Sequence, residues 1–217
     1  MLPLAGKQRP PRPISWDERE KLLSELPAHL REMALFVLNT GVRDDVVCNL
    51  KWDWELPIPE LGISVFETPA ENVKGRRMTK LVVCNSVAQS VIERARNAHP
   101  THVFAMQWRH HPLGPIRTMN ISAWQSARKR AGLPDLHVHD LRHTTGMLLR
   151  EAGVAQVTIR DILWHSGSTI TDHYTTGQIK ELHAALEKIT TPSNKWNKSI
   201  QSLRAEAAAR RQNGVNS

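Results

Sequence analysis

Apolar residues recur three and four positions apart along much of the chain, which is the spacing of α-helical stripes that face a core. The first such stretch begins at Ser15, which forms the sequence of a capping box with Glu18. The second runs from 29 to 39 and is followed by Gly41, a residue type that commonly ends helices. Similar patterns predict short helices further on, at 44–50, 86–97, 120–131, 139–152, 157–163 and 179–189. The chain is therefore predicted to be mainly helical.

Two short runs, 63–68 and 81–84, are rich in the residues that favour β-strands. Between them lies the polar, turn-forming stretch 71–77, which contains Lys74 and two arginines. This pattern predicts a β-hairpin that presents basic residues, and a further brief strand is expected at 102–105, before a long loop with Pro112. The predicted fold class is α+β, a mainly helical domain with a small antiparallel β-sheet or hairpin.

Composition changes along the chain suggest three parts. Residues 1–14 hold four prolines and three basic residues without an acid, and are expected to form an extended basic linker rather than a packed element. Residues 15–190 carry the helical and strand patterns of one folded domain. Residues 191–217 are expected to form a polar C-terminal tail.

The net charge of the chain indicates which class of binding partner to expect. The 217 residues include 29 Lys and Arg against 21 Asp and Glu, which gives a formal net charge of +8. Such an excess favours a polyanionic partner, first of all a nucleic acid. No apolar run is long enough for a membrane span or a signal peptide, and the two cysteines exclude a disulfide scaffold, so a reducing cytosol is the expected compartment.

An ordered set of chemically active residues runs through the chain. HDLRHT occupies 139–144 and includes His139 and Arg142; His165 follows 23 positions after Arg142, and Tyr174 nine positions later. Upstream, TGVR at 40–43 ends in Arg43, LKW occupies 50–52, and Lys74 lies in the predicted hairpin turn. In this order and spacing the set resembles the catalytic domain of the tyrosine recombinases, the phage integrase family. The resemblance covers roughly residues 15–189.

The residue types also suit the cleavage of a DNA strand without a metal ion or ATP. A tyrosine phenol can store the energy of a phosphodiester as a phosphotyrosyl ester, and Tyr174 is the only tyrosine of the chain. The transition state gathers negative charge on phosphate oxygens, which guanidinium groups bind through parallel hydrogen bonds. Arg43 and Arg142 suit that task.

The resemblance implies the remaining roles. His139 would handle a proton beside the arginines, His165 would donate a hydrogen bond to the phosphate, and Lys74 would protonate the departing 5′-hydroxyl. The fold would be that of the DNA breaking–rejoining enzymes, with no cofactor and no metal ion. The implied partner is double-stranded DNA, bound by a homotetramer in which 179–189 docks on a neighbour. The expected setting is integration or excision of a prophage or mobile element at the nucleoid in the bacterial cytoplasm.

Structural interpretations stand beside these roles. Tyr174 would otherwise be a half-buried aromatic residue, Lys74 a solvated hairpin lysine, and Arg43 an ion-pair partner of Asp44 or Asp45. The basic run at 128–130 would contact phosphates or only solvent. A third hypothesis, a metal-dependent hydrolase, rests on the histidines at 137, 139 and 143, but helical spacing turns the first of these away from the other two.

Three departures from the family pattern motivate the alternative of a truncated or decayed integrase that only binds DNA. Val46 stands where the family usually has an acid three positions after the first arginine, and Asp45 is one position earlier. Trp164 stands where the family usually has glycine, next to His165. The N-terminal core-binding domain typical of the family is not found before the predicted linker.

Overall fold

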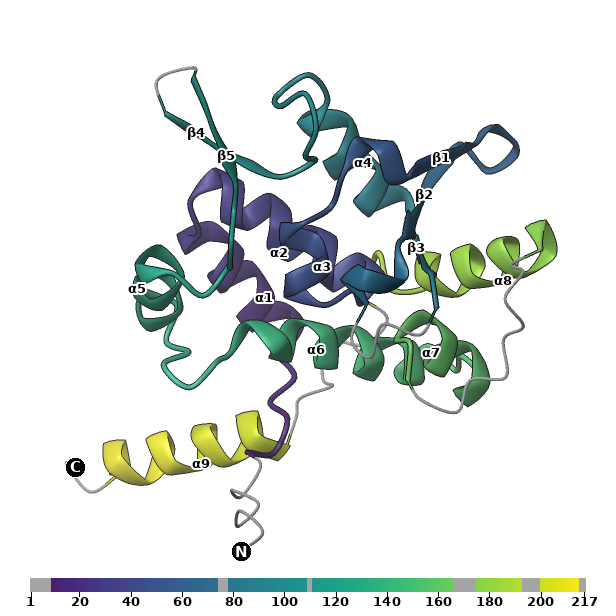
Figure 1. The fold of residues 1–217 in the computed structure, drawn as a ribbon. Coiled ribbons are helices and arrows are strands. Elements are labelled where there is room, and N and C mark those ends of the chain that lie inside the picture. Colours follow the sequence, from purple (N-terminus) through teal and green to yellow (C-terminus); the bar gives the residue numbers. More distant parts are fainter. Residues whose placement is uncertain (1–8, 74–77, 109–110, 166–174, 193–199, 215–217) are drawn as a thin grey trace, which may run out of the picture.

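The computed structural model describes residues 9–73, 78–108, 111–165, 175–192 and 200–214 (Figure 1). The α-helices are α1 (Trp16–Glu25), α2 (Ala28–Thr40), α3 (Asp44–Cys48), α4 (Ser86–Ala95), α5 (Ser122–Arg130), α6 (Val138–Glu151), α7 (Gln156–Ile162), α8 (Thr176–Glu187) and α9 (Ile200–Gly214). The strands are β1 (Glu55–Ile58), β2 (Ile63–Thr68), β3 (Lys80–Val83), β4 (Ala105–Trp108) and β5 (His111–Pro115). The predicted α+β class is confirmed.

Helix α2 lies at the centre of the larger hydrophobic core (Figure 1). Its apolar stripe, which includes Leu30, Met33 and Val37, is almost fully buried and packs against α4 and α6. The preceding helix α1 begins with the predicted capping box, in which Ser15 and Glu18 exchange side-chain and backbone hydrogen bonds. Gly41 ends α2 in the left-handed conformation, with φ +69°. These local signals fix where the central helices begin and end.

The larger sheet has the antiparallel strand order β1–β2–β3, with Ile58 opposite Ile63 and Thr68 opposite Lys80. Strand β2 is buried on both faces, because Phe66 packs in the larger core while Val65 packs in a smaller core with α7 and α8. The expected pairing of 63–68 with 81–84 is present, with β3 shifted by one residue. Strand β1, with Leu56 exposed and a proline at position 57, was not expected.

Other elements differ from the expected ones in detail. The helix expected at 86–97 ends at Ala95, and Asn85 caps its start, because the Asn85 side chain accepts a hydrogen bond from the Ala88 N–H. The strand expected at 102–105 lies at 105–108 and pairs with β5, in a stretch expected to be a loop. Helix α9 lies within the expected polar tail and stands apart from the rest of the chain in Figure 1.

Residues 9–14 are extended, as expected, but the expectation that they are unpacked is wrong. The Arg9 guanidinium donates two hydrogen bonds to the Asp140 carboxylate, at 3.0 and 2.8 Å. The Arg12 N–H donates to the other carboxylate oxygen at 2.9 Å, and the Ile14 N–H donates to the Thr144 hydroxyl at 3.0 Å. The Ile14 side chain is 1% exposed. The segment is therefore fixed along the first two turns of α6.

The expectation that 179–189 docks on a neighbouring molecule is also corrected. The apolar face of α8, with Ile179, Leu182 and Leu186, is buried in the smaller core of its own chain. The helix contacts α7 and β3. Because this face is already covered, it is not available to a second molecule.

Asp140 accepts hydrogen bonds from Arg9, Arg12 and the His137 N–H while being only 2% exposed. We expect Asp140→Ala to lower the free energy of unfolding by about 2–3 kcal/mol, because buried donors to a charged group lose their acceptor. Chemical denaturation measures the change. The control is Asp135→Ala, whose side chain is exposed and whose backbone oxygen alone binds Arg9; equal effects of the two variants would contradict this account.

Gly41 and Gly153 both have φ +69°, but a Cβ on Gly41 would lie 2.7 Å from Leu163 Cδ2, whereas one on Gly153 would meet nothing within 4 Å. We expect Gly153→Ala to cost about 1 kcal/mol of unfolding free energy from backbone strain, and Gly41→Ala about 2–4 kcal/mol because overpacking is added. Thermal or denaturant unfolding of the pair separates the two contributions. A Gly41 variant no less stable than the Gly153 variant would show that the contact is not tight.

Candidate active site

Arg43 follows the turn made by Gly41 and directly precedes α3. Its side chain is half-buried, and among the described residues its guanidinium makes no hydrogen bond or ion pair, so the expected alternative of pairing with Asp44 or Asp45 is not seen there. Arg43 thus stands between a left-handed turn and a short helix. No described residue uses the N–H donors of its guanidinium.

Arg142 lies on α6, 3% exposed. Its Nη1 donates to the Gly41 carbonyl at 2.5 Å, and its Nη2 donates to the Leu163 carbonyl. Burial, and then the charge of Arg43, lower the pKa of Arg142 to about 9, which leaves the guanidinium protonated at neutral pH. The cation is therefore held by backbone oxygens that carry no full charge, and it retains its affinity for an anion.

His139 is one turn before Arg142 on the same face of α6, as the sequence spacing predicts. Its ring meets that of His143 edge to face, with centroids 4.7 Å apart. Burial, followed by His143 and Arg142, lowers the pKa of His139. The ring is consequently neutral at pH 7 and able to accept a proton.

His165 is exposed and follows the end of α7. Its backbone N–H donates to the Arg160 carbonyl at 3.0 Å, which fixes the turn that presents the ring. Partial burial of the ring lowers the pKa of His165, and the charges of Arg142 and Arg43 contribute next. The charges of both arginines thus act on His165, and the Leu163 carbonyl that Arg142 binds is only two residues before it.

The structure thus brings together four of the six residues singled out in the sequence: Arg43, His139, Arg142 and His165. The other two, Lys74 and Tyr174, lie outside the described residues. Their catalytic roles, like those of the four, stay predictions.

At the departure from the family pattern at Val46, the nearest acid is Asp45, one position earlier. Val46 is 1% exposed in the larger core, where a carboxylate would be buried. Asp45 accepts a hydrogen bond from the Val46 N–H at 2.9 Å, and its charge raises the pKa of Arg142, against the effect of burial. An acid one position earlier therefore still acts on the buried arginine.

The departure at Trp164 does not displace His165 from the cluster. The indole is 7% exposed and packs in the larger core, and its Nε1 donates to the Leu81 carbonyl at 3.0 Å. The ring is directed into the protein, while His165 remains exposed to solvent and under the influence of both arginines.

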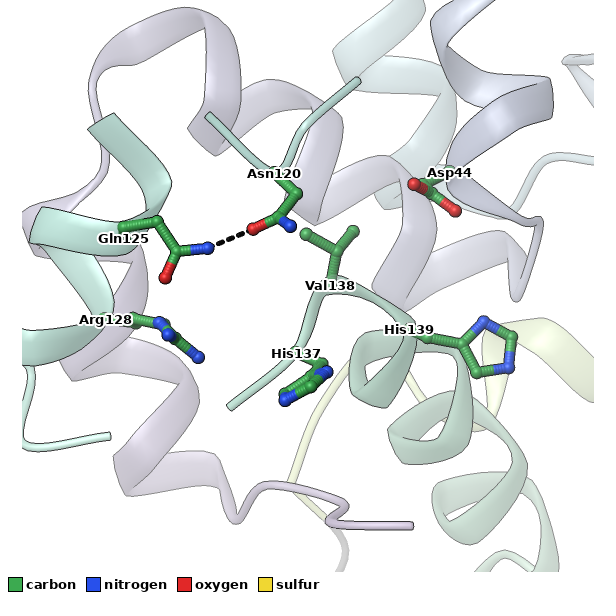
Figure 2. A pocket seen from close by; sticks show the side chains of 7 residues that line it. All are labelled: Asp44, Asn120, Gln125, Arg128, His137, Val138 and His139. Carbon is green, nitrogen blue, oxygen red and sulfur yellow. Dashed lines mark hydrogen bonds between the residues drawn. The ribbon is translucent and has the colours of Figure 1, made fainter. Parts of the chain in front are cut away.

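A polar pocket of about 240 Å³ adjoins the cluster. Figure 2 shows Gln125 and Arg128 of α5 on one side of it and His137 and His139, at the start of α6, on the other. Arg128 is anchored by a 2.6 Å hydrogen bond from Nη1 to the Leu136 carbonyl, and its buried Nε has no partner among the described residues. The pocket is therefore lined mainly by side chains that can donate hydrogen bonds, together with the Asp44 carboxylate and Val138, next to His139.

The metal hypothesis gains no support from the described residues, where no three His, Cys, Asp or Glu side chains are grouped so that they could hold an ion. Cys48 and Cys84 are both buried and free.

Among the described residues, the helices are too short or too polar to cross a membrane.

Sequence reasoning missed the groups that hold Arg142, the carbonyls of Gly41 and Leu163. Every residue has a carbonyl, so no residue type marks these acceptors. It also missed the contact of Arg9 with Asp140, which joins residues 131 positions apart. The sequence shows an acid at the third position of α6, Asp140, but neither its burial nor its distant partner.

Comparison with known proteins places these features in a family. The model of the phage integrase family matches residues 14–181. The integrase of Salmonella phage P22 is 30% identical over 146 residues, which are 63% of this chain and 36% of that protein. Among solved structures, the integrase from mycobacterium phage Brujita has a TM-score of 0.63 and 22% identity, over 90% of this chain and 62% of that one.

The Tn1549 transposon integrase, solved in complex with circular intermediate DNA, has a TM-score of 0.56 and 17% identity, over 94% of this chain and 67% of that one. These two structural likenesses concern the fold. The chain spans about a third of the length of the P22 integrase and less than two thirds of the Brujita chain. The family match, which covers most of the chain and every residue of the cluster, shows that this protein belongs to the phage integrase family of tyrosine recombinases.

Proposed function

We propose that this chain is the strand-cleaving part of a site-specific DNA recombinase, which cuts and rejoins one strand at a time through a 3′-phosphotyrosyl intermediate. The observation that carries the proposal is the cluster of Arg43 and buried Arg142 beside two histidines of lowered pKa. Such a cluster suits a phosphodiester, because the phosphate is a single anion with several oxygens that accept hydrogen bonds.

In the first step, the phenol oxygen of Tyr174 attacks the scissile phosphorus and the bond from phosphorus to the 5′-oxygen breaks. The phenol proton passes to the neutral imidazole of His139. The two arginines bind the non-bridging oxygens, on which charge increases in the transition state, and His165 donates a further hydrogen bond. The 3′-phosphate is then an ester of the tyrosine.

The departing 5′-oxygen takes a proton from Lys74, so that it leaves as a hydroxyl rather than as an alkoxide. Rejoining is the reverse: a new 5′-hydroxyl attacks the phosphotyrosyl ester and the phenol is released. No cofactor is consumed, because the energy of the cleaved bond is kept in the ester.

Double-stranded DNA is the proposed partner. The charge of +8 and the DNA complex of the similar Tn1549 integrase support this. By the family resemblance we infer a homotetramer on two DNA sites, acting at the bacterial nucleoid in the integration or excision of a prophage or mobile element. With the apolar face of α8 covered, the exposed Ile200 and Leu203 of α9 are the candidate contacts with a neighbour.

The alternative is an integrase fragment that binds DNA without cleaving it. One of the departures that motivate it is accommodated, since Trp164 packs in the core and the charges of both arginines still act on His165. At the other, Val46, the neighbouring Asp45 acts on Arg142. A further reason to consider this alternative is that the chain covers only part of the length of its relatives. The distinction between the two functions is whether a covalent product forms.

We expect the chain, mixed with nicked duplexes that span the genomic flanks of its gene, to give a DNA-linked protein band on a denaturing gel. Tyr174→Phe should abolish the band, and Arg142→Gln should reduce it about a hundredfold or more, as the loss of a transition-state donor does. Excess chelator should change nothing. A band that persists in Tyr174→Phe, or that disappears with chelator, would refute the phosphotyrosyl mechanism.

The pocket beside His139 is the proposed position of a backbone phosphate next to the scissile one. We expect Arg128→Gln to lower the slope of log affinity against log salt concentration by about one unit, because one phosphate contact is lost. Arg130→Gln is the matched control from the same helix turn, since its guanidinium is paired with Glu25 at 2.6 Å. Fluorescence anisotropy with a labelled duplex gives both slopes. Identical slopes for the two variants would place the phosphate elsewhere.

A further inference from the structure

The turn after α7 contains an uncommon backbone conformation. The Trp164 N–H donates to the Asp161 carbonyl at 3.1 Å and the His165 N–H to the Arg160 carbonyl at 3.0 Å. This pair of bonds ends a helix only if the residue at position 164 is left-handed, and Trp164 has φ +50°. A residue with a Cβ is strained there by roughly 1–2 kcal/mol. Some other interaction of Trp164 must offset the strain.

Two interactions of the indole do so. The ring is 7% exposed within the larger core, and Nε1 donates to the Leu81 carbonyl of β3 at 3.0 Å. The preceding residue, Leu163, points into the smaller core, where it lies against Gly41. Two consecutive side chains thus enter two different cores, and the turn cannot shift without disturbing one of them.

The same turn supplies two groups to the candidate active site. The Leu163 carbonyl accepts a hydrogen bond from Nη2 of Arg142, and the ring of His165 is within the electrostatic influence of both arginines. Trp164 is the residue between them, and it is the one of the three that is bonded to the sheet. A movement of its indole would therefore be passed on to both groups.

We propose that Trp164 is a positioning residue, which ties the 163–165 turn to strand β3 and thereby sets Arg142 and His165 to face the same phosphate. That the two groups face a phosphate rests on the proposed function, whereas the tie itself does not. Trp164 touches neither DNA nor a reacting atom in this account; it acts through Leu163 and His165.

Trp164→Phe tests the tie, because phenylalanine keeps an aromatic ring in the core but has no N–H for the Leu81 carbonyl. Trp52→Phe is the matched control: Trp52 also packs on the larger core, and its Nε1 also donates to a backbone carbonyl, that of His99, at 3.0 Å. The two variants lose the same kind of hydrogen bond, and only one of them is next to His165.

The first readout needs no DNA. The ring pKa of His165, measured by NMR titration and assigned with His165→Gln, reports first the burial of the ring and then its distance from the charged groups around it, which are Arg142, Arg43, His143 and Arg160. We expect this pKa to rise toward the ordinary histidine value in Trp164→Phe and to stay unchanged in Trp52→Phe. An unchanged His165 pKa in a folded Trp164→Phe protein would overturn the proposal.

A second measurement covers the case in which Trp164→Phe does not fold. In the unsubstituted protein, the amide protons of Trp164 and His165 should exchange with solvent as slowly as those of β3, because the turn opens only with the strand. Exchange of these two amides at the rate of a freely opening turn would overturn the proposal without any substitution.

The third readout is the covalent product. Trp164→Phe should slow its formation about tenfold, because a small displacement of the binding groups is costly in the transition state, while the dissociation constant for DNA stays the same. Trp52→Phe should do neither, and an equal slowing in the control would overturn the proposal. If the unsubstituted chain forms no covalent product at all, the proposed function fails, and the His165 titration still decides whether Trp164 positions the turn.

Discussion

The burial of Arg142 without a carboxylate partner among the described residues is the constraint on which the candidate active site depends. Removing a guanidinium from water is costly, and proteins commonly offset the cost with a paired acid. Here two backbone carbonyls, from Gly41 and Leu163, take that place. Arg43 adds a like charge, which increases the cost further. A site built in this way is stabilised most by an anion that enters from solvent.

Three distant segments must meet for this arrangement to form. The turn at Gly41 supplies one carbonyl, α6 supplies the arginine, and the turn after α7 supplies the other carbonyl. Close packing keeps them together, since a side chain on Gly41 would collide with Leu163. The segment 9–14 then fixes the start of α6 through Asp140, which directly follows His139 and lies two residues before Arg142. Stability and the geometry of the cluster therefore rest on the same contacts.

Local chemistry made much of the fold predictable. The capping box at Ser15, the left-handed end of α2 at Gly41 and the spacing of His139 from Arg142 are all properties of a few neighbouring residues, and each is found in the structure. The features that escaped prediction depend on distant partners. Strand β5 contains two prolines and forms through its pairing with β4. Residues 9–14 look like a solvated linker until Asp140, some 130 positions away, binds them.

In the candidate active site, too, some features can be predicted from the sequence and others cannot. The residue types suited to binding and cutting a phosphodiester can be recognised in the sequence, whereas the acceptors that hold Arg142 are main-chain groups, which no residue type marks. Trp164 illustrates the point. From the sequence it is a bulky residue beside a candidate site histidine, and only the left-handed backbone and the bond to Leu81 give it a structural reason.

The central claim, that Arg43, His139, Arg142 and His165 form one phosphate-binding site, is tested most directly by locating a phosphate mimic. Crystals of the chain soaked in tungstate would reveal the ion by its anomalous scattering. The account predicts the strongest peak within hydrogen-bond distance of both guanidinium groups, and its loss in Arg142→Gln. A crystal in which tungstate occupies other basic surfaces while this cluster stays empty would contradict the account.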